Sequence, residues 1–171
     1  TIQSAIDDAA TVDGDIIVVA AGTYPEQVNI TKAITLRGPN TGIDPNTGTR
    51  VAEAVIAPVG SGTVGITVQP EIGAVTVDGF TVQGYTDRGF RQRYTAAGTE
   101  TPVHVLNNIF DPLANDYWYA IEVNSDGSTV LNNLIKAGTA LNASNSIGIV
   151  TYDSSNLSIE DNVIGGSTLI S

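Results

Sequence analysis

The sequence predicts an all-β protein, a single-stranded parallel β-helix in which one chain winds into stacked coils. Three observations predict this solenoid. Most of the chain consists of short runs rich in Val, Ile and Thr, such as DIIVVA, AITLRG and VTVDGFTVQG, separated by Gly, Asn, Asp and Pro. Turns of asparagine type recur at a nearly constant interval. A helical period is present only in the first ten residues.

The opening segment TIQSAIDDAA predicts a short amphipathic helix that ends near Thr11. Apolar and polar residues fall on opposite sides of it: Ile2, Ala5, Ile6 and Ala9 against Gln3, Asp7 and Asp8. Such a helix would cover the apolar cross-section and the open strand edges of a first coil. We therefore expect residues 1–14 to be an N-terminal cap and residues 15–171 to form the coils of one domain.

Three later segments repeat one pattern of strand, turn, strand, turn and strand: GITVQPEIGAVTVDGFTVQG (65–84), AIEVNSDGSTVLNNLIKAG (120–138) and GIVTYDSSNLSIEDNVIGG (148–166). Their spacing leaves room for one more, degraded unit around 91–110. A unit of this length without a helix cannot bury its apolar side alone, so copies must stack, each strand pairing in parallel with its counterpart in the next coil.

The turns at 79, 108, 133 and 162 recur every 25 to 29 residues. Asparagine tolerates the left-handed backbone conformation of a sharp bend, and its amide can bond to the equivalent residue about 4.8 Å away, one coil along. We interpret Asn108, Asn133 and Asn162 as a structural ladder, in which Gly79 meets the same backbone demand without the amide.

Composition limits the partners. The chain has 171 residues with 7 basic and 18 acidic side chains, a net charge of -11, which argues against nucleic acid and anionic membranes as partners. It has no apolar run of transmembrane length, so no membrane insertion is expected. Cysteine and methionine are absent. We expect a secreted or cell-surface protein that is part of a longer or processed chain.

The N-terminal stretch TIQSAIDDAATVDGDIIVVAAGTYPEQVNITKAITLRG (1–38) resembles the opening of the pectin lyase-like superfamily of right-handed parallel β-helices. The matching positions are Ile2, Gln3, Ala5, Ile6, Asp7, Gly14, Asp15, Gly22, Thr23, Tyr24, Glu26, Val28, Lys32 and Gly38. The resemblance implies a right-handed solenoid. It does not imply one function, because the superfamily includes lyases, hydrolases, esterases, epimerases, adhesins and structural domains.

The catalytic sets of such enzymes are not found in the sequence. The only histidine, His104, alternates with two valines and is expected to point outward without a carboxylate partner. Asp44 opens DPNTGTR, which lacks the distal glutamate of a calcium loop and is interpreted as a turn. The sequence therefore predicts no catalytic residues, no metal site and no cofactor, with calcium left open as a ligand.

Three segments, 86–94, 111–120 and 136–146, are predicted to be insertions at the same turn of successive coils, stacked on one side of the solenoid. Aromatic and charged side chains there suit the stacking and hydrogen bonding of sugars. The predicted carbohydrate-binding residues are Arg88, Arg91, Arg93, Tyr94, Asp116, Tyr117, Trp118 and Lys136. The alternative is that these loops only pack on one another.

The first hypothesis for function is a structural, adhesive or self-assembling domain, whose partner is itself by end-to-end stacking, or an acidic or neutral polysaccharide. A second is a carbohydrate-binding β-helix. A third is a polysaccharide lyase, hydrolase or epimerase whose catalytic coils are missing from this chain or unrecognised in it.

Overall fold

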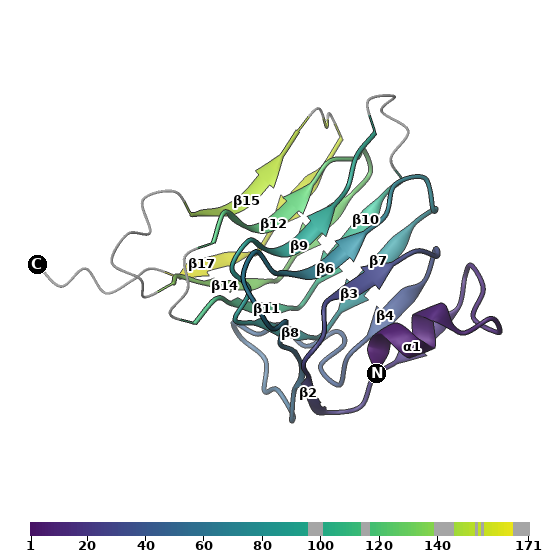
Figure 1. Ribbon diagram of the computed structural model, residues 1–171. Coiled ribbons are helices and arrows are strands. Elements are labelled where there is room, and N and C mark those ends of the chain that lie inside the picture. The colour runs from purple at the N-terminus through teal and green to yellow at the C-terminus, as the bar shows by residue number, and fades with distance from the viewer. Residues whose placement is uncertain (96–100, 114–116, 139–145, 153, 155, 166–171) are drawn as a thin grey trace, which may run out of the picture.

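The computed structural model describes residues 1–95, 101–113, 117–138, 146–152, 154 and 156–165. Its strands form three parallel sheets that wrap around one apolar interior, the β-helix that the sequence predicts (Figure 1). Each coil contributes one strand to each sheet in turn. Because sheet C has five strands, the described chain completes about five coils.

The strands are short, three to five residues each. Sheet A contains β1 (Ile16–Val18), β4 (Thr35–Arg37), β7 (Val75–Asp78), β10 (Val103–Leu106), β13 (Thr129–Leu131) and β16 (Ser158–Glu160). Sheet B contains β2 (Gly22–Tyr24), β5 (Ala54–Ile56), β8 (Thr81–Gln83), β11 (Ile109–Asp111), β14 (Leu134–Lys136) and β17 (Val163–Gly165). Sheet C contains β3 (Val28–Ile30), β6 (Val64–Val68), β9 (Arg88–Gln92), β12 (Tyr119–Val123) and β15 (Ile147–Thr151).

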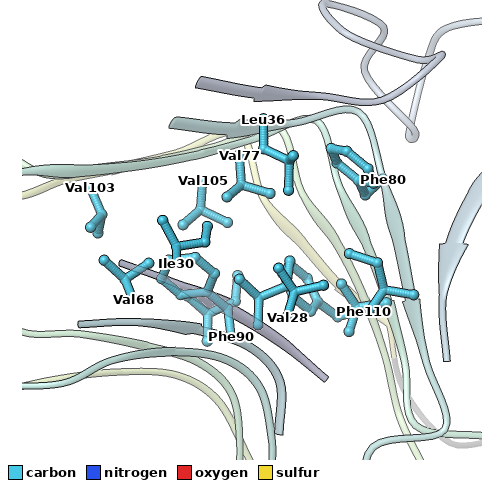
Figure 2. Packing of buried hydrophobic residues seen from close by; sticks show 14 of the residues in the cluster. Val28, Ile30, Leu36, Val68, Val77, Phe80, Phe90, Val103, Val105 and Phe110 are labelled. Carbon is cyan, nitrogen blue, oxygen red and sulfur yellow. The ribbon is translucent and has the colours of Figure 1, made fainter. Parts of the chain in front are cut away.

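The core is made of columns in which residues of the same register stack from coil to coil. In sheet A one column contains Leu36, Val77, Val105 and Val130, and in sheet C another contains Val28, Ile66, Phe90 and Ile121. All eight are buried, and Figure 2 shows members of both columns directed toward one another across the interior. This packing explains why the inward positions of the strands are occupied by apolar residues.

The N-terminal helix α1 covers Ile2–Asp7 and is shorter than predicted. It ends because Asp8 leaves the helical conformation (φ -56°, ψ 133°) and its Oδ1 accepts a hydrogen bond from the backbone N–H of Ala10 at 2.8 Å. Ala9 is consequently exposed and not part of the buried face, which contains only Ile2 and Ile6. No helix among the described residues is long and apolar enough to cross a membrane.

Two charged side chains of the first coil hold α1 in place beside β3 (Figure 1). The Glu26 carboxylate accepts hydrogen bonds from the backbone N–H groups of Ile2 (2.8 Å) and Gln3 (3.0 Å) at the start of the helix. The ammonium group of Lys32 donates to the carbonyls of Ile6 and Asp8 at its end. These contacts satisfy backbone groups that a helix leaves open and oppose its dipole.

At the turn between sheets A and B, the left-handed backbone conformation and the amide ladder belong to two neighbouring residues, whereas the sequence predicted both for one residue. The left-handed conformation falls on the first residue of each turn: Gly79 (φ 82°), Asn107 (φ 53°), Asn132 (φ 55°) and Asp161 (φ 53°). The second residue forms the amide ladder. Gly79 therefore belongs to the left-handed column, and Phe80 occupies its coil's place in the ladder column.

The ladder runs through Asn108, Asn133 and Asn162. The Oδ1 of Asn133 accepts from the backbone N–H (2.9 Å) and the Nδ2 (3.2 Å) of Asn108. The Oδ1 of Asn162 accepts from the same two groups of Asn133, both at 2.9 Å. At the other end, the Oδ1 of Asn108 accepts from the N–H of Phe80 at 2.9 Å. Each amide thus replaces a backbone acceptor at the bend.

The loop 38–53, between β4 and β5, lies over the turn at Gly79. A Cβ at residue 79 would come within 2.2 Å of the backbone nitrogen of Thr41. Arg50 fastens the loop, since its guanidinium donates to the carbonyls of Ile43 (2.9 Å) and Asn107 (2.8 Å). This close approach explains why glycine stands here while the later coils carry asparagine or aspartate.

Candidate functional site

The charged and aromatic side chains of the middle coils gather on the outer face of sheet C. Gly65 and Gly89 face inward, since a Cβ at each would meet Val82 and Phe110 of the core. The outward positions on either side form two columns across neighbouring strands. One contains Val64, Arg88, Tyr119 and Ile147, and the other contains Asn29, Thr67, Arg91, Glu122 and Val150.

Arg88 is held between two carboxylates. Its Nε donates to Glu122, and its Nη1 donates to Asp87 at 2.6 Å. Its guanidinium carbon lies 5.0 Å from the centre of the Tyr119 ring, a cation–π contact. Burial opposes the charge of Arg88, but the adjacent charges of Glu122 and Asp87 outweigh burial and raise its pKa. Arg88 is therefore a fixed cation.

Glu122 is an acid on the outer face that is only 3% exposed. The carboxylate oxygen that bonds to Arg88 also lies 3.7 Å from the Nε of Arg91. Two guanidinium groups thus compensate a carboxylate that would be costly to bury alone. A carboxylate bound in this way is a poor general base, because a base must be free to accept a proton from a substrate.

Arg91 is the more accessible of the two cations. Its side chain is 35% exposed, but its Nε–H is buried and has no hydrogen-bond acceptor among the described residues. Only the accessible part of the side chain is therefore available to an acceptor outside the chain.

Three aromatic side chains lie beside these charges. Trp118 is 62% exposed and meets the ring of Tyr119 edge to face, with centroids 6.4 Å apart. The hydroxyl of Tyr152 donates to the hydroxyl of Tyr119 at 3.0 Å, and this bond raises the pKa of Tyr152. We call this group the sheet C patch: Arg88, Arg91, Trp118, Tyr119, Glu122 and Tyr152.

The backbone at Trp118 is fixed on both sides. Its N–H donates to the carbonyl of Asp87 (2.9 Å), and its carbonyl accepts from the N–H of Ile147 (2.9 Å). The residue thus extends the sheet C pairing by one position before β12. Because this backbone is already paired, it does not have to be ordered when the exposed tryptophan binds a ligand.

The structure separates the eight residues that the sequence grouped. Arg88, Arg91 and Trp118 come together in the patch. Tyr117 is buried against Tyr85, with centroids 5.4 Å apart. Lys136 ends β14 in sheet B, where it pairs with Asp111 at 2.9 Å. Asp116 lies outside the described residues.

Arg93 and Tyr94 follow β9 and therefore lie at the opposite end of that strand from Asp87 and the backbone of Trp118. Arg93 donates to the side chain of Gln69 at 3.3 Å, and Tyr94 is exposed.

The prediction of an insertion loop at 86–94 was wrong. Arg88–Gln92 is strand β9, in register with β6 and β12. This strand opens the degraded repeat unit, which begins slightly earlier than predicted. Strand β9 resembled a loop because it is rich in arginine. On its outer face, arginines that pair with acids replace the usual small polar residues. The inward Gly89 and Phe90 were the signal.

Three patch residues were not among the predicted site residues: Tyr119, Glu122 and Tyr152. The register of β9 with β12 pairs Arg88 with Tyr119 and Arg91 with Glu122. An alignment that placed Gly89 beneath Gly65 and Ala120 would have revealed both pairs. Tyr152 lies just after β15, and no sequence pattern indicates that its hydroxyl reaches Tyr119.

Other positions considered for chemistry have local roles. The Asp44 carboxylate accepts from Thr47 and Asn46 of its own loop, and these hydrogen bonds lower its pKa. His104 is half-buried on the outer face of sheet A, between Thr76 and Thr129, and burial lowers its pKa. Within the described part of the chain, no three His, Asp or Glu side chains lie close enough to hold a metal ion.

In comparisons with known proteins, no family model, no curated protein and no solved structure matches this chain. The resemblance to the pectin lyase-like superfamily therefore rests on the sequence motifs of residues 1–38, and on a fold that is consistent with it.

Proposed function

We propose that this protein is a non-catalytic β-helix domain, secreted or at the cell surface, that binds polysaccharide through the sheet C patch. The observation that carries the proposal is the exposed ring of Trp118, presented on a fixed backbone in edge-to-face contact with Tyr119, whose ring also contacts the guanidinium of Arg88. Aromatic faces stack on the C–H faces of sugar rings, and neighbouring donors bind sugar hydroxyls or carboxylates.

The chemistry of the patch favours binding over catalysis. The two carboxylates beside Arg88, those of Glu122 and Asp87, are both paired with its guanidinium, and Glu122 is nearly inaccessible. Glycoside hydrolysis by the usual route needs two carboxyl groups that are free to act on either side of the bond. A polysaccharide lyase, hydrolase or epimerase whose catalytic coils lie outside this chain or are unrecognised in it is the alternative proposal.

The test is binding to a panel of neutral and acidic polysaccharides, measured by affinity electrophoresis and calorimetry. Trp118→Ala should weaken binding at least tenfold, since truncating a central tryptophan costs about 2 kcal/mol or more. Arg91→Ala should weaken binding of acidic glycans more than neutral ones. Tyr94→Ala is the matched control, because Tyr94 is an exposed aromatic outside the patch.

Binding that survives both patch substitutions would contradict the proposal. Cleavage of any bound polysaccharide, assayed with and without calcium, would favour the enzyme alternative.

Self-association along the solenoid axis is a second candidate for the partner. Its support is β1, an edge strand of sheet A whose two outward side chains, Ile16 and Val18, are exposed. Light scattering at increasing concentration tests it. If the mass does not increase, end-to-end stacking of this chain is excluded under those conditions.

A further inference from the structure

Tyr119 and Tyr152 bring two phenol groups together on neighbouring coils. Their hydroxyl oxygens are 3.0 Å apart, and 33 positions separate the two residues in the chain. Tyr152 is 42% exposed and Tyr119 is partly exposed, so small oxidants and their radicals can reach the pair. The ring of Tyr119 is fixed by Arg88 on its face and by an edge-to-face contact with Trp118.

We propose that Tyr119 and Tyr152 form a modification site at which one-electron oxidation makes a dityrosine cross-link between β12 and the end of β15. The oxidant is hydrogen peroxide acting through a haem peroxidase, a chemistry available to proteins in oxidising surroundings. This inference is independent of the proposed binding of polysaccharide.

The reaction balances as follows. Each phenol loses one electron and one proton to give a neutral phenoxyl radical. The two radicals join through a carbon–carbon bond between the ring positions next to each hydroxyl carbon, and the hydrogens on those carbons move to the oxygens to restore both aromatic rings. Hydrogen peroxide takes up the two electrons and two protons and becomes two molecules of water. The protein loses two hydrogens in total.

The other four tyrosines are poorer sites for coupling within one chain. Tyr85 and Tyr117 lie close together but are buried, which shields them from an enzyme-generated oxidant. The hydroxyl of Tyr24 is bound to the carbonyl of Ala20 at 2.8 Å. Tyr94 is exposed, but none of the described aromatic rings pairs with it. Tyr94 is therefore the residue to remove when coupling between molecules must be prevented.

Trypsin provides a direct assay. Cleavage after Arg93 and Lys136 releases peptides 94–136 and 137–171, and the second contains Tyr152 as its only tyrosine. A link between these two peptides must therefore use Tyr152. In a Tyr94→Phe background, fragmentation mass spectrometry distinguishes Tyr119 from Tyr117 as its partner.

The experiment treats dilute Tyr94→Phe protein with a haem peroxidase and limiting hydrogen peroxide. We expect a monomer that has lost two hydrogens, dityrosine fluorescence, and a linked peptide joining Tyr119 to Tyr152. Adding Tyr119→Phe or Tyr152→Phe should remove that peptide while leaving the far-ultraviolet circular dichroism unchanged. The cross-linked monomer should also unfold at a higher urea concentration, because the link restricts the unfolded chain.

Two results would overturn the proposal. One is the absence of the Tyr119–Tyr152 peptide from the treated Tyr94→Phe protein. The other is an equal yield when the protein is first unfolded in urea, since the coupling would then not depend on the arrangement of the two strands.

Discussion

Asn133 provides the sharpest test of how the turns hold the coils together. Its side chain is fully buried and accepts from two groups of Asn108 while donating to the carbonyl of Val105 at 2.8 Å and to Asn162. Asn133→Ala removes all of these bonds. The N–H of Asn108, whose acceptor is the Oδ1 of Asn133, would then be buried without a partner.

The cost follows from this geometry. A buried donor left without an acceptor costs about 1–3 kcal/mol, and the other lost bonds add about 1 kcal/mol net, so the free energy of unfolding should fall by about 2–4 kcal/mol. For a chain of this size the melting temperature falls by about 2–4 °C per kcal/mol, so we expect a drop of roughly 5–15 °C.

Asn132→Gly is the matched control. The neighbouring Asn132 has a left-handed backbone (φ 55°), and within the described part of the chain its side chain makes only a long bond to Asn107 at 3.4 Å. Glycine adopts this conformation freely, so the substitution should change stability by less than about 1 kcal/mol. Urea unfolding followed by circular dichroism measures both variants. The assignment of the ladder to the second asparagine fails if Asn132→Gly is as destabilising as Asn133→Ala.

Three further predictions concern the cap, a buried glycine and pH. Glu26→Gln should destabilise the protein by about 1 kcal/mol and speed amide hydrogen exchange in α1, because a charged acceptor for Ile2 and Gln3 is lost; unchanged exchange would contradict this role. Gly79→Ala should lower the free energy of unfolding by about 3 kcal/mol or more, since its Cβ would collide with the backbone of Thr41. Gly42→Ala, with open space around it, should lower it by only about 1–2 kcal/mol, the strain of a left-handed alanine. Equal urea midpoints for the two variants would refute this difference. Because burial lowers the pKa of His104, the unfolded chain binds the proton more tightly, and the free energy of unfolding should fall as pH decreases below about 6.5. His104→Thr, which matches the neighbouring Thr76 and Thr129, should weaken that pH dependence. Urea unfolding at several pH values measures it.

The sequence was a good guide to elements whose cause is local. Strands with inward Val, Ile and Leu appear at the runs rich in Val, Ile and Thr that predicted them, because a parallel solenoid repeats the same environment at each coil. The recurrent asparagine turn was also visible. Which of two adjacent asparagines bends the backbone was not, because that depends on which side chain faces the next coil.

The candidate site was predictable only in part. The sequence predicted Trp118, Arg88 and Arg91 as binding residues, but it did not predict which side chains lie next to them. The pairs Arg88–Tyr119 and Arg91–Glu122 come from the register of β9 with β12, which the predicted loop at 86–94 had concealed. Lys136 was expected beside them because it follows a similar strand, yet it ends a strand of sheet B and pairs with Asp111.

By itself, the sequence determined the fold class, the N-terminal cap and the period of the coils, because these depend on local preferences and on an apolar pattern that repeats. Only the tertiary structure decided why residue 79 is glycine beneath the loop 38–53 and which polar side chains meet on sheet C. Those outcomes depend on contacts between residues tens of positions apart, and strand pairing sets such contacts to within one residue. A shift of one residue in that register would turn the patch toward the core.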